Sequence, residues 1–257
     1  MPNCRLKNQV ALITGASRGI GHAVAKKFAE EGAELILPVR DEECAKNLIK
    51  ELSPFGGKIL TPVGDLTDSS FFPRLSEAVE KKFQRLDILI ASAGELGPIS
   101  LLSNIDDADW EKVLDINLTA NFRLIKTFDP LLRRAKAARL VFVTSGVTRN
   151  QGRAKLGPYS LTKCALEAMA KTYAYETADT PIRINLLNPG PTRTSMRAAV
   201  CPDEDPLTVK SPERVSEFFL NLCLPECQDS GRIFDITLDT PTPAATMLDF
   251  PCRATAR

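Results

Sequence analysis

The sequence has few of the features that direct a chain to membranes or nucleic acids. No apolar run approaches the roughly 18 residues of a membrane helix, and the start of the chain shows no apolar signal region, so we expect a cytoplasmic protein with no membrane partner. Basic and acidic residues nearly balance, at 33 against 32. The net charge of +1 gives no field that would attract nucleic acid.

Disulfides and metal ligands are also scarce. Seven cysteines are scattered along the chain, and their odd number favours reduced thiols over a disulfide framework. Cys223 and Cys227 form a Cys-x3-Cys pair. A zinc site needs about four ligands, and the single histidine, His22, lies far away in the sequence. We therefore predict no metal site and interpret the pair as ordinary thiols at the end of a helix.

What the chain does contain is a regular alternation of short apolar runs and longer amphipathic segments, in 257 residues that are 44% hydrophobic. Strands are predicted at 10–13, 35–37, 58–63, 86–90, 140–143, 182–187 and 232–236. Helices are predicted at 19–31, 41–52, 68–84, 107–134, 157–178 and 212–222. The longest helix is expected to turn inward Trp110, Val113, Leu114, Leu118, Phe122, Ile125 and Leu132.

This alternation predicts βαβ units with right-handed crossovers. The expected fold class is α/β: a doubly wound Rossmann fold with a parallel sheet of about seven strands and helices on both faces. No repeat or linker divides the chain, so residues 1–257 are predicted to form a single NAD(P)-binding domain. Residues from about 237 to 257 hold three prolines and no periodicity, which predicts an irregular C-terminal tail.

A glycine-rich turn joins the first predicted strand to the first helix. It reads Thr14-Gly-Ala-Ser-Arg-Gly-Ile-Gly21, a Gly-x3-Gly-x-Gly spacing rather than the common Gly-x-Gly-x2-Gly. Glycines at such a turn let the backbone approach a pyrophosphate, whose charge meets the helix N-terminus. Its position directly after the strand predicts a dinucleotide site, with a simple packing turn as the alternative.

The octet resembles the cofactor motif of the short-chain dehydrogenase/reductase superfamily, single-domain subgroup. Other segments between about residues 8 and 195 resemble the same family. Asp65 matches its adenine-contacting Asp, Ala91-Ser-Ala-Gly94 its Asn-Asn-Ala-Gly turn, and Pro189-Gly190 its turn beside the nicotinamide. The predicted cofactor-binding residues are Gly15, Ser17, Arg18, Gly19, Ile20, Gly21, Arg40, Asp65, Leu66, Ala93, Gly94, Tyr159, Lys163, Pro189, Gly190, Thr192 and Thr194.

The end of the second strand distinguishes the two nicotinamide cofactors. A free ribose 2′-hydroxyl calls for a carboxylate there, whereas a 2′-phosphate calls for Arg or Lys. Val39 takes that position, Arg40 follows it, and Arg18 of the turn could face the same pocket. Two cations favour NADP(H), unless both are merely solvated. NAD(H) is the alternative cofactor because Asp41 is adjacent.

Tyr159 and Lys163 are four residues apart on a predicted helix and therefore share one face. A nearby ammonium lowers the pKa of a phenol, ordinarily near 10, so the pair suits proton transfer. Tyr-x3-Lys is a weak motif by itself, but neither Tyr173 nor Tyr175 has a lysine four residues on. The resemblance implies that Tyr159 is the general acid or base and that Lys163 lowers its pKa and binds the nicotinamide ribose.

Two further residues complete the predicted catalytic set. Ser145 follows the fifth strand, at the edge where parallel sheets bind ligands, and its hydroxyl is expected to hold a substrate oxygen. Thr144 is the competing hydroxyl. Ser145 precedes Tyr159 by fourteen residues, one more than in the resembled family. Asn117 matches the family residue that supports a proton relay through water to Lys163.

The resemblance implies an NADP(H)-dependent oxidoreductase that transfers hydride between the nicotinamide and a small carbonyl or secondary alcohol. A non-catalytic NADP(H)-binding sensor is one alternative, although such a protein would tolerate loss of the tyrosine. A sugar-nucleotide epimerase or dehydratase is another, although its Gly-x2-Gly-x2-Gly turn and longer substrate domain are missing.

The charges around the expected pocket and the exposed helices indicate which partners the protein has. The residues expected to border the substrate pocket include five cations, which suit an anionic substrate unless they form only a solvated basic loop. They are Arg149, Arg153, Lys155, Arg193 and Arg197. Helices 107–134 and 157–178 could pair across a two-fold axis, so a homodimer or homotetramer is expected.

Overall fold

A computed structural model describes residues 4–237, so all of the predicted tail except Thr237 lies outside the described residues. One parallel sheet of seven strands runs through them in the order β3-β2-β1-β4-β5-β6-β7. The strands are β1 Val10–Thr14, β2 Glu34–Ile36, β3 Ile59–Leu60, β4 Ile88–Ala91, β5 Arg139–Val143, β6 Arg183–Asn188 and β7 Ile233–Asp235. The predicted Rossmann fold is confirmed.

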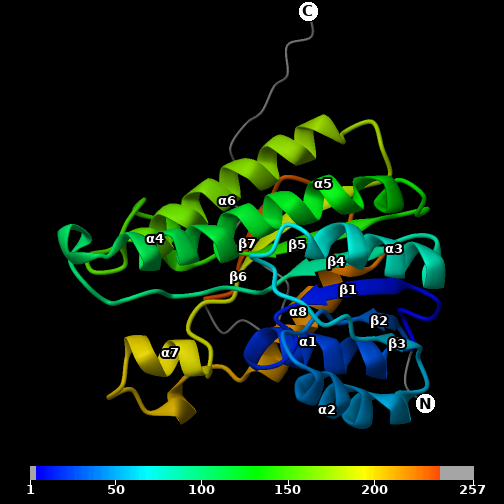
Figure 1. The fold of residues 1–257 in the computed structure, drawn as a ribbon, viewed down its shortest axis with the longest axis horizontal. Helices are drawn as coiled ribbons and strands as arrows, with labels where there is room; N and C mark the ends of the chain where they lie inside the picture. Colours follow the sequence, from blue (N-terminus) through cyan, green and yellow to red (C-terminus); the bar gives the residue numbers. More distant parts are fainter. Residues whose placement is uncertain (1–3, 238–257) are drawn as a thin grey trace, which may run out of the picture.

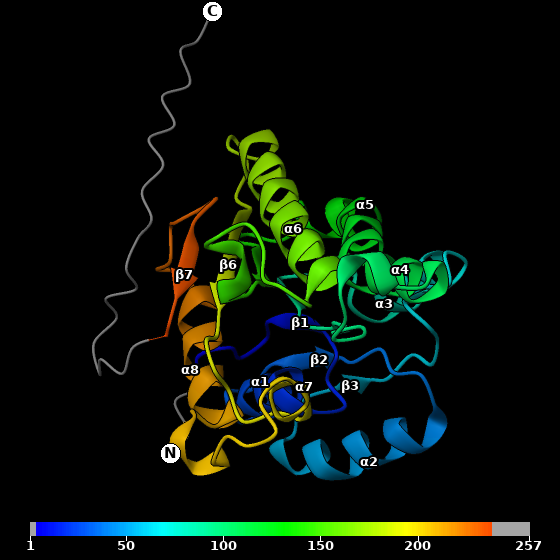
Figure 2. The same cartoon turned by 90° about the vertical axis from the view of Figure 1, so that its left-hand side faces the viewer.

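Helices cover both faces of this sheet (Figures 1 and 2). Helices α3, α5 and α6 pack on one face, and α1, α2 and α8 on the other. Side chains of β1 alternate between the two cores: Leu12 joins the first, whereas Ala11 and Ile13 join the second. The helices are α1 Gly19–Glu30, α2 Glu42–Leu52, α3 Phe71–Phe83, α4 Asp107–Leu114, α5 Ala120–Leu132, α6 Gly157–Glu176, α7 Ser195–Val200 and α8 Pro212–Cys223.

Three elements differ from the prediction, and one of them is helix α7, Ser195–Val200, which was not predicted. The third strand keeps only Ile59–Leu60 of the predicted 58–63, because Pro62 has no N–H to donate to a ladder. The predicted helix 107–134 is divided into α4, a π-helical segment Asp115–Thr119 and α5.

The inward face of this long helical stretch also differs. Phe122 was predicted to face the core, but its side chain is 53% exposed. Asn117 and Asn121 are buried instead: the amide of Asn117 bonds with Glu95, and Nδ2 of Asn121 donates to the carbonyl of Asn117. Val113 and Leu132 are buried and Ile125 packs against the core as predicted, so the hydrophobic pattern fails at Phe122 rather than along the whole face.

None of the helices within residues 4–237 combines the length and apolar character needed to cross a bilayer. In the same part of the chain, no three His, Cys, Asp or Glu side chains gather closely enough to hold a metal ion. Cys223 is buried at the end of α8, where burial raises the pKa of its thiol.

Candidate active site

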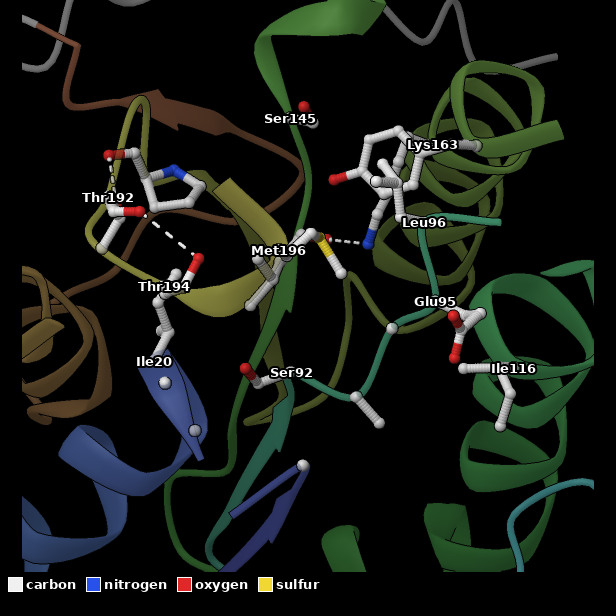
Figure 3. Close-up of a pocket in the computed structure, with 18 of the residues that line it drawn as sticks. Ile20, Ser92, Glu95, Leu96, Ile116, Ser145, Lys163, Thr192, Thr194 and Met196 are labelled. Carbon is white, nitrogen blue, oxygen red and sulfur yellow. Dashed lines mark hydrogen bonds between the residues drawn. The ribbon is translucent and has the colours of Figure 1, made fainter. Parts of the chain in front are cut away.

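The carboxyl ends of the strands border a pocket of about 580 Å³ (Figure 3). Its walls come from the turn after β1, the loops after β4, β5 and β6, and the start of α6. Every predicted cofactor-binding residue lines this pocket, as do Ser145, Tyr159 and Lys163. Asn117, Lys155 and Arg193 are the predicted residues that do not line it, and the side chain of Asn117 is fully buried.

Glycine is required at the turn after β1. Gly15 has a φ of +71°, and a Cβ there would lie 2.8 Å from the backbone nitrogen of Ala93. A Cβ on Gly21 would lie 2.3 Å from the carbonyl oxygen of Gly15. No side chain caps the N-terminus of α1, so the N–H groups of its first turn are left for a ligand. This cradle fits a pyrophosphate.

A threonine hydroxyl ties the first strand to the turn after β4. Thr14 Oγ1 accepts hydrogen bonds from the backbone N–H groups of Ser92 and Ala93, each at 3.2 Å. Ala91 and Ser92 stand where the resembled motif has two Asn residues, so this hydroxyl braces the turn here. The position was missed in the sequence, although a polar residue that ends a buried strand was the available signal.

Two arginines line the pocket, one in the turn after β1 and one after β2. Arg18 and Arg40 line it, both are exposed, and neither forms an ion pair within residues 4–237. Asp41 is already engaged, because its Oδ1 accepts from the N–H of Cys44 at 2.8 Å and caps α2. The structure therefore offers a phosphate two cations, while the carboxylate of Asp41, next to Arg40 in the sequence, caps a helix.

The candidates for proton transfer are Tyr159 and Lys163 on α6 and Ser145 after β5. Lys163 Nζ donates to the carbonyl oxygen of Val143 at 2.7 Å and lies 5.7 Å from the ring centroid of Tyr159. Burial lowers the pKa of Lys163 to about 8, while the charge of Glu167 raises it. Burial raises the pKa of the Tyr159 phenol, and a hydrogen bond with Ser145 lowers it.

The structure separates the two competing hydroxyls after β5. Thr144 is only 2% exposed, and its Oγ1 donates to Glu167 Oε1 at 2.5 Å. Ser145 lines the pocket together with Tyr159, and its side chain lowers the pKa of the phenol. Ser145 rather than Thr144 is therefore the hydroxyl that acts on the phenol.

The buried side chain of Asn117 connects the loop after β4 to helix α6 through hydrogen bonds. Its Oδ1 accepts from the N–H of Glu95 at 2.8 Å, and its Nδ2 donates to the carbonyl of Glu95 at 2.9 Å and to Thr162 Oγ1 at 3.1 Å. A Cβ on Gly94 would lie 3.4 Å from Asn117 Oδ1 and 3.8 Å from Lys163 Nζ. Asn117 thus holds the loop after β4 close to the lysine.

Ion pairs occupy part of the predicted basic rim. Arg149 bonds Asp235 through Nε at 2.9 Å, and Arg197 lies 2.5 Å from Glu204. Arg153 lines the pocket and forms no ion pair in the described part of the chain. The sequence missed several other lining residues, which no motif marks: Glu95, Leu96, Lys112, Ile116, Met196 and Val200.

A nucleotide cradle at one end of a pocket and a Tyr–Lys–Ser cluster at the other define a class that the comparisons also identify. The sequence profile of the family described as short chain dehydrogenase matches residues 9–205. The chain belongs to this short-chain dehydrogenase/reductase family and is an oxidoreductase of that class.

Particular relatives are similar over most of their length. YciK of Escherichia coli K12, named an uncharacterized oxidoreductase, is 35% identical over 91% of this chain and 92% of its own. The 3-oxoacyl-[acyl-carrier-protein] reductase FabG of Thermotoga maritima is 32% identical over 84% of this chain and 83% of its own. A short chain dehydrogenase structure from Shigella flexneri 2a, complexed with NADP, has a TM-score of 0.86 and 34% identity, over 91% of this chain and 98% of that one.

Proposed function

We propose that the protein is an NADP(H)-dependent oxidoreductase acting on a carbonyl or secondary alcohol, with Tyr159 as the general acid or base. The observation that carries the proposal is the pocket itself, which Tyr159, Lys163 and Ser145 share with the phosphate turn. The NADP complex of the Shigella relative supports the choice of cofactor. An epimerase or dehydratase has no such support, and a non-catalytic sensor would not need the cluster.

The residues present fit the cofactor. The turn at Gly15 and Gly21 leaves room for backbone to approach a pyrophosphate, and Arg18 and Arg40 supply charge for a 2′-phosphate. Thr192 and Thr194 lie on the wall beside Ile20, where their hydroxyls can fix a carboxamide (Figure 3). When bound, NADP(H) supplies or accepts the hydride.

The protein's own groups then handle the proton. In the reduction, Tyr159 donates its phenolic proton to the substrate oxygen, and Ser145 orients that oxygen by a hydrogen bond. Lys163 favours the phenolate that remains, because its ammonium lies close to the ring. Asn117 fixes the neighbouring loop and, in the predicted relay, supports the water that returns a proton to Lys163. Alcohol oxidation uses the same groups in reverse.

The test is a cofactor assay on the purified protein with small ketones, diketones and acyl thioester mimics. We expect NADPH consumption with at least one carbonyl compound, and a higher kcat/KM with NADPH than with NADH. A folded protein that binds NADPH tightly but consumes it with no compound of the panel would instead support the sensor.

We also propose that the substrate carries negative charge, which Arg153 recognises from the pocket wall. Arg153→Ala is expected to raise KM for a carboxylate-bearing substrate about tenfold, since it removes a charge-assisted hydrogen bond, and to leave KM for a neutral ketone unchanged. Lys155→Ala is the matched control, because Lys155 belongs to the same loop but does not line the pocket. Equal effects on charged and neutral substrates would contradict the proposal.

The proposed assembly is a homodimer or homotetramer through the outer faces of α5 and α6, which lie side by side in Figures 1 and 2. Phe122 on α5 is 53% exposed and Leu161 on α6 is 47% exposed. Replacing both with Glu is expected to yield monomers by light scattering, because charge replaces an apolar contact surface. Ile49→Glu on α2 is the control and should leave the mass unchanged. A monomeric unmodified protein would refute the assembly.

A cytoplasmic location stays a prediction.

A further inference from the structure

A carboxylate behind the pocket binds both threonines that flank Ser145. Glu167 lies four residues after Lys163 on α6, and its Oε1 accepts from Thr144 Oγ1 at 2.5 Å and from Thr148 Oγ1 at 2.8 Å. Hydroxyl groups that donate to an ionised carboxylate form short and strong hydrogen bonds. One oxygen of one side chain therefore connects α6 to both ends of the segment that carries Ser145.

These bonds determine the conformation of Ser145. The carbonyl oxygen of Ser145 accepts from the N–H of Thr148 at 3.2 Å, and it lies 2.9 Å from Thr148 Oγ1, whose single proton it shares with Glu167. On the other side, the N–H of Thr144 donates to the carbonyl of Leu187 in β6 at 2.9 Å. The backbone of Ser145 is thus held between two residues that Glu167 fixes. Its own Oγ accepts from the N–H of Val147 at 3.5 Å, and its hydroxyl lowers the pKa of the Tyr159 phenol.

Glu167 also acts on the lysine of the same helix. Its charge raises the pKa of Lys163, against the lowering caused by burial. Lys163 Nζ also lies near the ring of Tyr159, the carbonyl of Val143 and the backbone of Gly94, and none of these three groups carries a charge at neutral pH. Cys164, whose thiol pKa Glu167 also raises, and Lys171 are the neighbouring titratable groups on α6.

We propose that Glu167 is a positioning residue for the reaction: its carboxylate holds Thr144 and Thr148 and so fixes the Ser145 hydroxyl against Tyr159, while its charge supports Lys163. The inference rests on the proposed function, because it assigns Glu167 a task only if Ser145 and Tyr159 act on the substrate. Nothing in the Tyr-x3-Lys motif marks this residue. Only the folded loop after β5 brings the two threonines to it.

The test compares two replacements of Glu167 in the full-length enzyme. Glu167→Leu removes both hydrogen bonds and is expected to lower kcat about 10- to 100-fold with little change in the Kd of NADPH. Glu167→Gln keeps an oxygen that can accept from both threonines, so we expect kcat within about threefold of the wild type. Loss of the negative charge should nevertheless lower the pKa of Lys163 and move the alkaline limb of the kcat profile to lower pH, by about half a unit or more.

Several controls make each outcome decisive. Glu176→Leu removes an exposed carboxylate from the same helix and should change neither kcat nor the pH profile. If Glu167→Leu fails to fold, Thr148→Val takes its place, and we expect a fall in kcat of at least about threefold. Wild-type kcat in the folded Leu variant, or an unmoved alkaline limb in the Gln variant, would overturn the proposal. Tyr159→Phe is measured alongside: if it stays active, the proposed function itself has failed.

Discussion

Replacing Tyr159 with phenylalanine is expected to lower kcat about 10²- to 10⁴-fold, the usual contribution of a positioned general acid. The substitution keeps the ring that lies near Lys163 and removes only the hydroxyl, whose pKa Ser145 lowers. Fold and cofactor affinity should therefore survive. Steady-state kinetics with NADPH and a carbonyl substrate, together with the Kd of NADPH from fluorescence, measure the two effects separately.

Tyr175→Phe is the matched control, because this phenol lies on the same helix and its side chain is 58% exposed. Its kcat should equal that of the wild type. A Tyr159→Phe enzyme within about threefold of the wild type would remove Tyr159 from the mechanism, since general acid catalysis contributes far more than this.

The pH dependence of the same reaction has a definite sign. Reduction needs the protonated phenol and oxidation needs the phenolate. Burial raises the pKa of Tyr159, whereas Ser145 lowers it. Reduction should therefore proceed at neutral pH and decline as the pH rises through the pKa of the Tyr159 phenol. Oxidation should show the opposite trend.

Most of the fold could be predicted because its signals are local. Each strand is a short apolar run followed by an amphipathic helix, and parallel strands need such crossovers. The errors occur where polar groups are satisfied by partners that are remote in sequence. Asn117 is buried because Glu95 and Thr162 satisfy its amide, and neither residue can be identified from the helix alone. Phe122 was then assigned to the wrong face.

The residues of the candidate site also fall into two groups, those that local sequence signals predict and those that depend on partners remote in the sequence. Gly15 and Gly21 were predictable since a turn that approaches a phosphate excludes a Cβ, and Tyr159 and Lys163 because one helical turn brings them together. Glu167 and Asp235 were not predictable. Glu167 bonds with Thr144, and Asp235 bonds with Arg149. In each case the partner comes from a distant part of the sequence, and only the folded sheet edge brings the two together.

The largest expected effect on cofactor choice is that of Arg40→Asp. Arg40 and Arg18 line the pocket with no ion pair in the described residues, so a 2′-phosphate would find two cations there. The change removes one charge-assisted contact and places a carboxylate against the phosphate. We expect kcat/KM with NADPH to fall about 10²-fold. kcat/KM with NADH should rise or stay constant, because a carboxylate can accept a hydrogen bond from a free ribose hydroxyl.

Lys46→Asp is the matched control, because it makes the same charge change at an exposed residue of α2 that does not line the pocket. It should alter kcat/KM for both cofactors equally or not at all. If the wild-type enzyme used NADPH and NADH with equal kcat/KM, the two arginines would be solvated surface groups rather than a phosphate site. Loss of NADH activity as well in Arg40→Asp would instead indicate damage to β2 and its neighbours, since NADH carries no 2′-phosphate for Arg40 to bind.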